Sequence, residues 1–198
     1  MLNVGLTGTV ASGKSAAGRM LEALGARRVD ADRIAHGLLN KGKPEAARVL
    51  KHFGPGVRAS GGGVDRAKLR QVVLACPTEL RFLERIVHPG VGRELRRVMA
   101  RTRSKKGVLV VEVPLLFECG MDKWMDLNVC VAAPASRQAA NAAKKGMRPA
   151  DWRRFSALQW PQAKKVRKAD RVVRNDGSLK EFRQKITVLY KELVKGGI

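Results

Sequence analysis

The stretch Gly8-Thr-Val-Ala-Ser-Gly13-Lys14-Ser15 decides the fold class of this 198-residue chain. It matches the pattern G-x-x-x-x-G-K-[ST] and follows a short apolar run, residues 2–6, that is typical of a buried strand. Residues 16–24 have the apolar spacing of an amphipathic helix. A strand, a glycine-rich turn and a helix in this order place backbone N–H groups around phosphate oxygens. The stretch therefore predicts a phosphate-binding loop, called the P-loop below.

Two side chains of the P-loop are expected to act on a bound nucleotide. Lys14 would neutralise the β- and γ-phosphates, and the Ser15 hydroxyl would bind Mg²⁺. The alternative is a chance turn rich in glycine and serine before a helix. The strand on one side and the helix on the other disfavour that alternative.

Short apolar runs alternate with helical patterns along the rest of the chain. We expect strands at residues 2–6, 28–29, 108–113, 127–132 and 171–173. The third strand is almost continuously apolar, as a strand covered on both faces would be. This alternation predicts an α/β fold with a parallel sheet, and Ser178 with Glu181 predicts a capping box at the last helix.

Two segments interrupt the alternation. Residues 33 to about 103 predict four or five consecutive helices with a glycine-rich turn at residues 61–63, which indicates a helical lobe inserted into the sheet. Residues 137–168 hold ten Lys and Arg against one acid, Asp151.

The charge balance is the unusual feature of the composition. Forty Lys and Arg against 17 Asp and Glu give a formal net charge of +23, which indicates an anionic partner. The 44% apolar content excludes a disordered chain. No apolar run approaches the length of a membrane span, and the N-terminus does not resemble a secretory signal. With three scattered cysteines, we expect a cytoplasmic protein without a membrane partner, as a monomer or weak oligomer.

Asp30 and Asp32 follow the short second strand. Asp is favoured at a helix N-cap, which is one interpretation of the pair. Loops at the carboxyl ends of parallel strands also line one crevice, where a carboxylate can accept a proton from an attacking hydroxyl. In an extended segment the two side chains point the same way, so on this count either could be the base.

Glu112 and His88 each have a structural and a functional interpretation. Glu112 ends the third strand, either as a surface charge or as a carboxylate near the water shell of Mg²⁺. Pro89 is expected to end the preceding helix, and a lone histidine beside it is more often a cap or core group than a catalyst.

Together these motifs resemble the dephospho-CoA kinase family over nearly the whole chain. The matching residues are Gly5-Leu-Thr-Gly8 before the P-loop, Gly25, Asp30-Ala-Asp-Arg-Ile-Ala35, Gly42-Lys-Pro44, Phe53-Gly54, Val64-Asp-Arg66, Leu69, Leu83-Glu84, Ile86, His88-Pro89, Val113-Pro-Leu-Leu-Phe-Glu118, Gln159, Pro161, Ala169-Asp170 and Asn175. The resemblance implies ATP-dependent phosphorylation of the ribose 3′-hydroxyl of dephospho-coenzyme A, the last step of coenzyme A biosynthesis. It also implies a P-loop kinase core of five parallel strands (1–32, 104–134 and 169–198), a helical coenzyme-binding lobe (33–103) and a basic, mobile lid (135–168).

The resemblance also implies a role for particular residues. Asp32 would be the catalytic base, acting with Lys14. The implied nucleotide-binding residues are Gly8, Ala11, Ser12, Gly13, Lys14, Ser15, Ala16, Lys144, Lys145 and Asn175. The implied substrate-binding residues are Thr7, Asp32, His88, Pro89 and Leu115, and Ser15 with Glu112 would hold Mg²⁺.

The chain departs from the family pattern at four places. Thr9 replaces a usual glycine, Ala16 a usual threonine, and Glu112 a usual aspartate. The lid reads Ala139-Ala-Asn-Ala-Ala143, so Ala140 and Lys144 stand where the family has arginines. The nearby basic residues Lys144, Lys145 and Arg148 are the candidates to replace the missing charge.

A second class of function competes with the kinase. The high charge favours a divergent P-loop protein with weak kinase activity that serves as a basic nucleic-acid-binding protein. The 5% aromatic content and the absence of a nucleic-acid-binding motif disfavour it. The retained Lys14, Ser15 and Asp32 would also have no use in a pure binder.

Overall fold

The computed structural model describes residues 1–195, which alternate between strands and helices. The strands are β1 (Leu2–Thr7), β2 (Arg27–Asp30), β3 (Val108–Glu112), β4 (Leu127–Ala132) and β5 (Arg171–Arg174). The helices are α1 (Lys14–Ala23), α2 (Ala31–Leu38), α3 (Pro44–Phe53), α4 (Arg66–Ala75), α5 (Pro77–Thr102), α6 (Ala135–Lys144), α7 (Pro149–Ala157), α8 (Gln162–Lys168) and α9 (Leu179–Lys195). Two 3₁₀ turns, η1 (Pro55–Val57) and η2 (Met121–Trp124), complete the described elements.

The chain folds as two compact units. One comprises Met1–Val29 and the described residues from Thr102 onward, and the other comprises Asp30–Arg101. The first unit holds the P-loop and nearly all of the sheet, and the second is helical.

A five-stranded sheet with the order β2-β3-β1-β4-β5 forms the centre of the first unit. Strand β1 pairs in parallel with β3 and with β4, and β4 pairs in parallel with β5. All five residues of β3 are buried, as its continuous apolar run predicted. The predicted α/β class with a five-stranded parallel sheet is confirmed.

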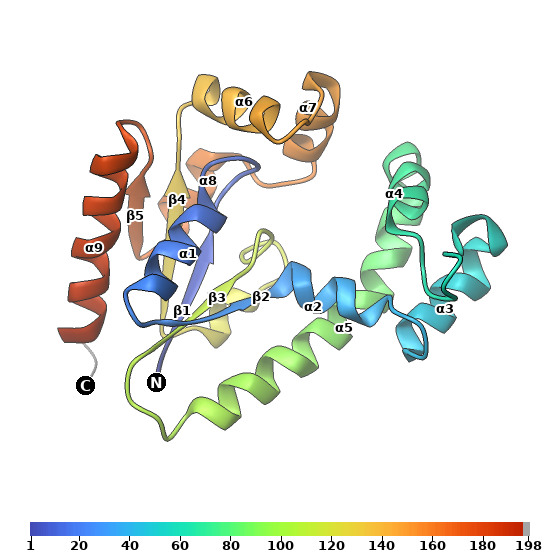
Figure 1. Ribbon diagram of the computed structural model, residues 1–198, viewed down its shortest axis with the longest axis horizontal. Coiled ribbons are helices and arrows are strands. Elements are labelled where there is room, and N and C mark those ends of the chain that lie inside the picture. Colours follow the sequence, from blue (N-terminus) through green and yellow to red (C-terminus); the bar gives the residue numbers. More distant parts are fainter. Residues whose placement is uncertain (196–198) are drawn as a thin grey trace. The chain divides into compact units, whose positions relative to one another are not determined.

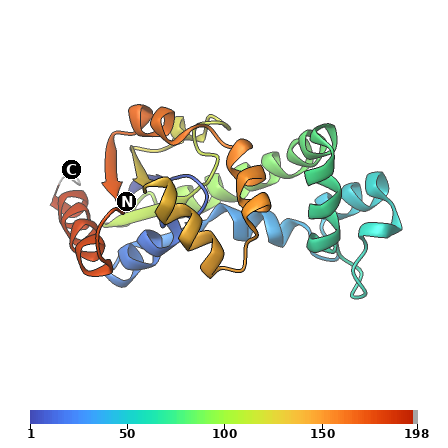
Figure 2. The same ribbon diagram turned by 90° about the horizontal axis from the view of Figure 1, so that it is seen from above.

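Helices cover both faces of this sheet. Figures 1 and 2 show α1 and α9 side by side on one face, and α8 lies against β4 on the other. The core between α1, α9 and the sheet includes Val4, Leu21, Val110, Phe182 and Ile186, all at most 2% exposed. The predicted capping box starts α9: Ser178 N–H donates to Glu181 Oε2 at 2.5 Å, and Glu181 N–H donates to Ser178 Oγ at 3.2 Å.

The second unit consists of α2, α3, α4 and most of α5, drawn in blue to green in Figure 1. Its glycine-rich turn at residues 61–63 is closed by an antiparallel bridge between Arg58 and Val64. Of the helices in residues 1–195, none is long and apolar enough to cross a membrane.

The prediction that Pro89 ends its helix is wrong, because α5 continues to Thr102. Proline inside a helix removes one hydrogen bond and costs about 3 kcal/mol. The apolar stripe continues beyond it through Val91 and Leu95, which are 4% and 0% exposed. Burying such side chains yields roughly 1.5–3 kcal/mol each, enough to hold the helix together through the proline.

Candidate active site

The P-loop connects β1 to α1 through backbone conformations that few residues adopt. Gly13, the residue before α1, has φ = 103°, and a Cβ there would collide with the side-chain amide of Asn175. Ala11 also has positive φ, at 61°. The Asn175 amide donates to the Ser12 carbonyl at 2.9 Å, so this sequence-distant residue fixes the loop before α1. A direct role of Asn175 in binding nucleotide stays a prediction.

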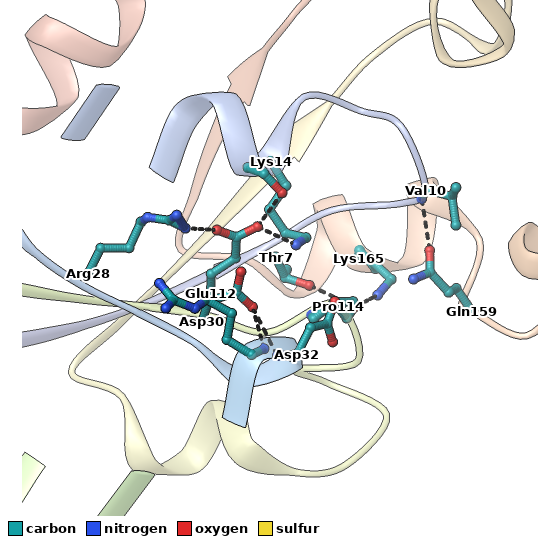
Figure 3. A network of polar contacts seen from close by, with 12 residues as sticks. Thr7, Val10, Lys14, Arg28, Asp30, Asp32, Glu112, Pro114, Gln159 and Lys165 are labelled. Carbon is teal, nitrogen blue, oxygen red and sulfur yellow. Dashed lines mark hydrogen bonds and ion pairs between the residues drawn. The ribbon is translucent and has the colours of Figure 1, made fainter. Parts of the chain in front are cut away.

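Glu112, at the end of β3, joins the P-loop to β2. Its Oε1 accepts hydrogen bonds from Lys14 Nζ at 2.7 Å and from Ser15 Oγ at 2.5 Å. Figure 3 shows the contact with Lys14. Its Oε2 accepts from Arg28 Nη1 at 2.9 Å. The side chain is 1% exposed, so the interpretation of Glu112 as a surface charge is wrong. It is a buried carboxylate between two cations, and Arg28 is a member of the site that the sequence pattern did not reveal.

The pKa values of this cluster follow from burial and pairing. Burial raises the pKa of Glu112, but the charge of Lys14 and the hydrogen bonds from Lys14, Ser15 and Arg28 lower it below its ordinary value. Burial lowers the pKa of Arg28, and the hydrogen bonds to Glu112 and Glu22 more than offset this effect. The carboxylate is therefore ionised at neutral pH and balanced by fixed positive charge.

Asp30 and Asp32 lie at the junction of β2 and α2 and have different surroundings. Asp30 is the N-cap of α2: its Oδ1 accepts from the backbone N–H groups of Asp32 at 2.9 Å and Arg33 at 3.4 Å. Asp32 lies in the first turn of the helix. The expectation of an extended segment with both carboxylates on one side is thus wrong, because the cap turns the chain into a helix after Asp30.

The loop after β3 is held by a lysine that the sequence reasoning missed. Lys165 in α8 is 0% exposed, and its Nζ donates to the Pro114 carbonyl at 2.6 Å and pairs with Glu118 Oε1 at 2.8 Å. The hydroxyl of Thr7 donates to the same carbonyl at 3.1 Å, as Figure 3 shows. These contacts fix the loop that carries Leu115. Binding of substrate by Thr7 and Leu115 stays a prediction.

Side-chain amides connect the expected lid to the P-loop. Thr9 Oγ1 donates to Gln138 Oε1 at 3.1 Å, and Asn141 Nδ2 donates to the Ala11 carbonyl at 3.0 Å. Gln159 Oε1 accepts from the Val10 N–H at 2.9 Å. The glutamines and the asparagine contribute hydrogen bonds without charge, and only Gln159 had a signal in the sequence, through the family resemblance.

The predicted helix at residues 139–143 is confirmed as part of α6, and its role as a lid stays a prediction. Lys144 and Lys145, at its C-terminal end, are exposed. Arg148 pairs with Asp151 at 2.8 Å, and this pairing raises the pKa of the guanidinium. Arg148 is therefore engaged with a carboxylate of its own segment.

His88 lies in a pocket within the helical unit rather than at the end of a helix. The pocket has a volume of about 660 Å³ and is lined by Thr78, Arg81, Glu84, Arg85, His88 and Pro89. Its three cation-capable side chains and one carboxylate suit a polar, anionic ligand. The structure thus brings His88 and Pro89 together with two arginines that the sequence reasoning did not single out.

Three features define this chain as a P-loop kinase. The P-loop follows the central parallel strand β1, the buried Glu112 ends the neighbouring strand β3, and a basic segment follows β4. A sequence model of the dephospho-CoA kinase family matches residues 2–181. The chain belongs to the dephospho-CoA kinase family.

Individual relatives agree with the family assignment. The chain is 38% identical over 98% of its length to the dephospho-CoA kinase of Symbiobacterium thermophilum, of which it covers 82%. It is 34% identical to that of Geobacillus kaustophilus, covering 96% of each chain. The solved dephospho-CoA kinase of Campylobacter jejuni shares its fold, with a TM-score of 0.75, 23% identity, and 99% of this chain and 98% of that chain covered. These findings support the kinase and not the nucleic-acid-binding alternative.

Proposed function

We propose that this kinase transfers the γ-phosphoryl group of ATP to the ribose 3′-hydroxyl of dephospho-coenzyme A, the last step of coenzyme A biosynthesis. One observation carries the proposal: within a chain of this family, Lys14, Ser15 and Glu112 lie in direct contact at the P-loop. A lysine, a hydroxyl and a carboxylate at this position are the groups that phosphoryl transfer from a nucleotide requires.

The nucleotide is held by the P-loop and by the residues around it. The backbone N–H groups from Gly8 to Ala16, including those of Ala11, Ser12 and Gly13, surround its phosphates at the start of α1. Lys14 binds the β- and γ-phosphates. Lys144 and Lys145 add positive charge from the end of α6. Asn175, whose amide donates to the Ser12 carbonyl in the P-loop, contributes to the nucleotide site.

Ser15 and Glu112 supply oxygen ligands that suit Mg²⁺, which binds one or two carboxylates or hydroxyls together with phosphate oxygens and water. The Ser15 hydroxyl would hold the metal ion, with the Glu112 carboxylate beside it. When bound, the metal ion shields the charge of the β- and γ-phosphate oxygens.

Asp32 is the base for the acceptor hydroxyl. The family resemblance assigns this role to Asp32, which lies in the first turn of α2, whereas Asp30 Oδ1 caps that helix. As the 3′-oxygen attacks the γ-phosphorus, Asp32 accepts the hydroxyl proton, the bond to the β-phosphate oxygen breaks, and ADP leaves. Thr7, His88, Pro89 and Leu115 contribute to binding the coenzyme.

The parts of the chain divide these tasks. Residues 33–103 form the coenzyme-binding lobe, and residues 135–168 form a lid that excludes water from the transferring phosphoryl group. Residues 1–32, 104–134 and 169–198 form the nucleotide-binding core, of which residues 196–198 lie outside the described part of the chain. We further propose that the enzyme acts in the cytoplasm as a monomer or weak oligomer.

A coupled assay of ADP release tests the function directly. With ATP present, addition of dephospho-coenzyme A should raise ADP release by at least a hundredfold over the rate without acceptor. Adenosine, which has a ribose 3′-hydroxyl but lacks the pantetheine arm, serves as the control acceptor. Equal ADP release with and without dephospho-coenzyme A would overturn the proposal.

A further inference from the structure

The two oxygens of the Glu112 carboxylate have different partners. Oε1 binds the two P-loop groups, Lys14 Nζ and Ser15 Oγ, whereas Oε2 binds Arg28 Nη1 on the neighbouring strand β2. Figure 3 shows the carboxylate between these partners. One oxygen therefore lies on the side of the nucleotide site, and the other on the side of β2.

Lys14 and Ser15, which contact Oε1, are also the residues that bind the nucleotide and its metal ion under the proposed function. Under the proposed function, Lys14 binds the β- and γ-phosphates and Ser15 binds the metal ion, so both must loosen their contacts with Glu112 when nucleotide enters. Glu112 is 1% exposed, and a buried carboxylate that loses its cation is strongly disfavoured. Without a further cation, the release of Lys14 would oppose nucleotide binding.

Arg28 is that further cation, and it is held independently of the nucleotide site. Its Nε lies 3.2 Å from Glu22 Oε2 on α1, while its Nη1 lies 2.9 Å from Glu112. The guanidinium side chain is 14% exposed, so solvent screens its charge only partly. Its planar fork can bind two carboxylates in a fixed geometry, which the single ammonium group of a lysine cannot do.

Gly18 in the interior of α1 leaves room for this arrangement. A Cβ at this position would lie 2.9 Å from Glu112 Oε2 and 3.0 Å from Arg28 Cδ. Glycine in a helix interior is unfavourable relative to alanine, so its presence here has a packing reason. The helix, the arginine and the carboxylate therefore fit together as one assembly.

We propose that Arg28 is a positioning residue of the phosphoryl-transfer reaction: it holds Glu112 in place and balances its charge, so that Lys14 and Ser15 can move from Glu112 to the nucleotide. The proposal rests on the proposed function. Arg28 acts through Glu112 and does not itself touch the substrates.

The test measures ATP binding by calorimetry at pH 8 with EDTA, so neither Mg²⁺ nor catalysis is needed. Arg28→Met keeps the apolar stem and removes the charge, which leaves Lys14 more tightly bound to Glu112. ATP affinity should fall about tenfold, within the range measured for residues coupled in one network. Arg27→Met is the matched control, since it removes the same charge from an exposed neighbour on the same strand and should change affinity less than twofold.

Combining Arg28→Met with Glu112→Gln tests whether Arg28 acts through Glu112 or through its long-range attraction for ATP. Glu112→Gln alone should tighten ATP binding under these conditions, because Lys14 is no longer paired with a carboxylate. In the Glu112→Gln background, Arg28→Met should change affinity less than twofold, while turnover with Mg²⁺ stays low. Arg28→Lys, which keeps the charge without the fork, should lose less affinity than Arg28→Met and provides the test if Arg28→Met does not fold.

The outcomes distinguish this proposal from the proposed function. If Arg28→Met binds ATP as tightly as the wild type, the positioning role is overturned. The same follows if Arg28→Met lowers ATP affinity equally in the wild-type and Glu112→Gln backgrounds. If Arg28→Met does not fold, an Arg28→Lys variant with wild-type ATP affinity overturns it as well. If Lys14→Ala binds ATP as tightly as the wild type, the P-loop assignment itself fails.

Discussion

The hydroxyl of Thr9 in the P-loop donates a hydrogen bond to Gln138 Oε1 in helix α6, at 3.1 Å. Thr9 stands where the family resemblance leads us to expect glycine, and its hydroxyl gives this chain a side-chain link between the P-loop and α6 that a glycine could not make. Gln138 is buried, and its Nε2 also donates to the Ala133 carbonyl at 2.8 Å. Helix α6, which lies in the proposed lid, is thus attached to the P-loop by neutral hydrogen bonds.

Thr9→Val should loosen α6 without removing bulk. The net worth of one hydrogen bond, about 0.5–1.5 kcal/mol, corresponds to a two- to tenfold increase in local opening. Amide hydrogen exchange of the residues in α6 should accelerate by that factor, and Thr9→Ser, which keeps the hydroxyl, should exchange like the wild type. Unchanged exchange in Thr9→Val would show that the hydrogen bond between Thr9 and Gln138 does not hold α6 in place.

Lys14→Ala should abolish phosphoryl transfer, because the β- and γ-phosphates lose their main side-chain counterion. The fold should survive, since Glu112 keeps its contacts with Ser15 and Arg28. Circular dichroism should show a cooperative melt, and the coupled assay should show less than a few per cent of wild-type transfer. A larger residual rate in folded protein contradicts the role of Lys14.

Substitution of Asp32 should affect catalysis, whereas substitution of Asp30 should affect stability. Asp32→Asn should lower kcat by about 10²–10⁴ with ATP affinity nearly unchanged, the usual effect of losing a general base. Asp30→Asn should be mild, because Asn is also a good N-cap, whereas Asp30→Ala should cost about 0.5–2 kcal/mol of stability. A large loss of kcat in Asp30→Asn together with a mild Asp32→Asn would identify Asp30 as the base.

An arginine added to the proposed lid should raise the activity of the enzyme. Ala140→Arg should raise kcat, because a guanidinium can bind two phosphate oxygens at once. Neutralising Lys144, Lys145 and Arg148 together should lower kcat far more than it weakens coenzyme binding. Since Arg148 pairs with Asp151, the single variant Arg148→Gln should contribute least. Normal turnover in the triple variant, with no gain in Ala140→Arg, means that the lid does not supply this charge.

Glu112 should make stability depend on pH in the acid range. Pairing lowers the pKa of Glu112 in the folded protein below its ordinary value of 4.5, so the unfolded chain takes up a proton first as pH falls. The stabilisation is therefore present above pH 4.5 and is lost as pH falls through the lower, folded value. The difference in unfolding free energy between the wild type and Glu112→Gln, measured by urea titration from pH 7 to 3, should shrink below about pH 4.5. A constant difference would show that Glu112 has no depressed pKa.

Local patterns predicted the parts of the fold that neighbouring residues decide. The P-loop between β1 and α1, the buried run of β3 and the capping box of α9 each depend on residues within a few positions of one another. The prediction that Pro89 ends its helix failed for the opposite reason. Burial of the apolar residues beyond Pro89 outweighed the local tendency of proline to end a helix.

The sequence by itself determined the class of the protein, its nucleotide-binding loop and its family, since each is written in the order and spacing of motifs. Only the tertiary structure decided which charged side chains form the site. Glu112 lies 98 residues from Lys14 and 84 from Arg28, and Lys165 is 51 residues from Pro114. Nothing local marks Lys165 among the ten basic residues of its segment, or Arg28 beside Arg27. The parallel sheet places the ends of β1, β2 and β3 together, and burial there selects the charges that have a partner.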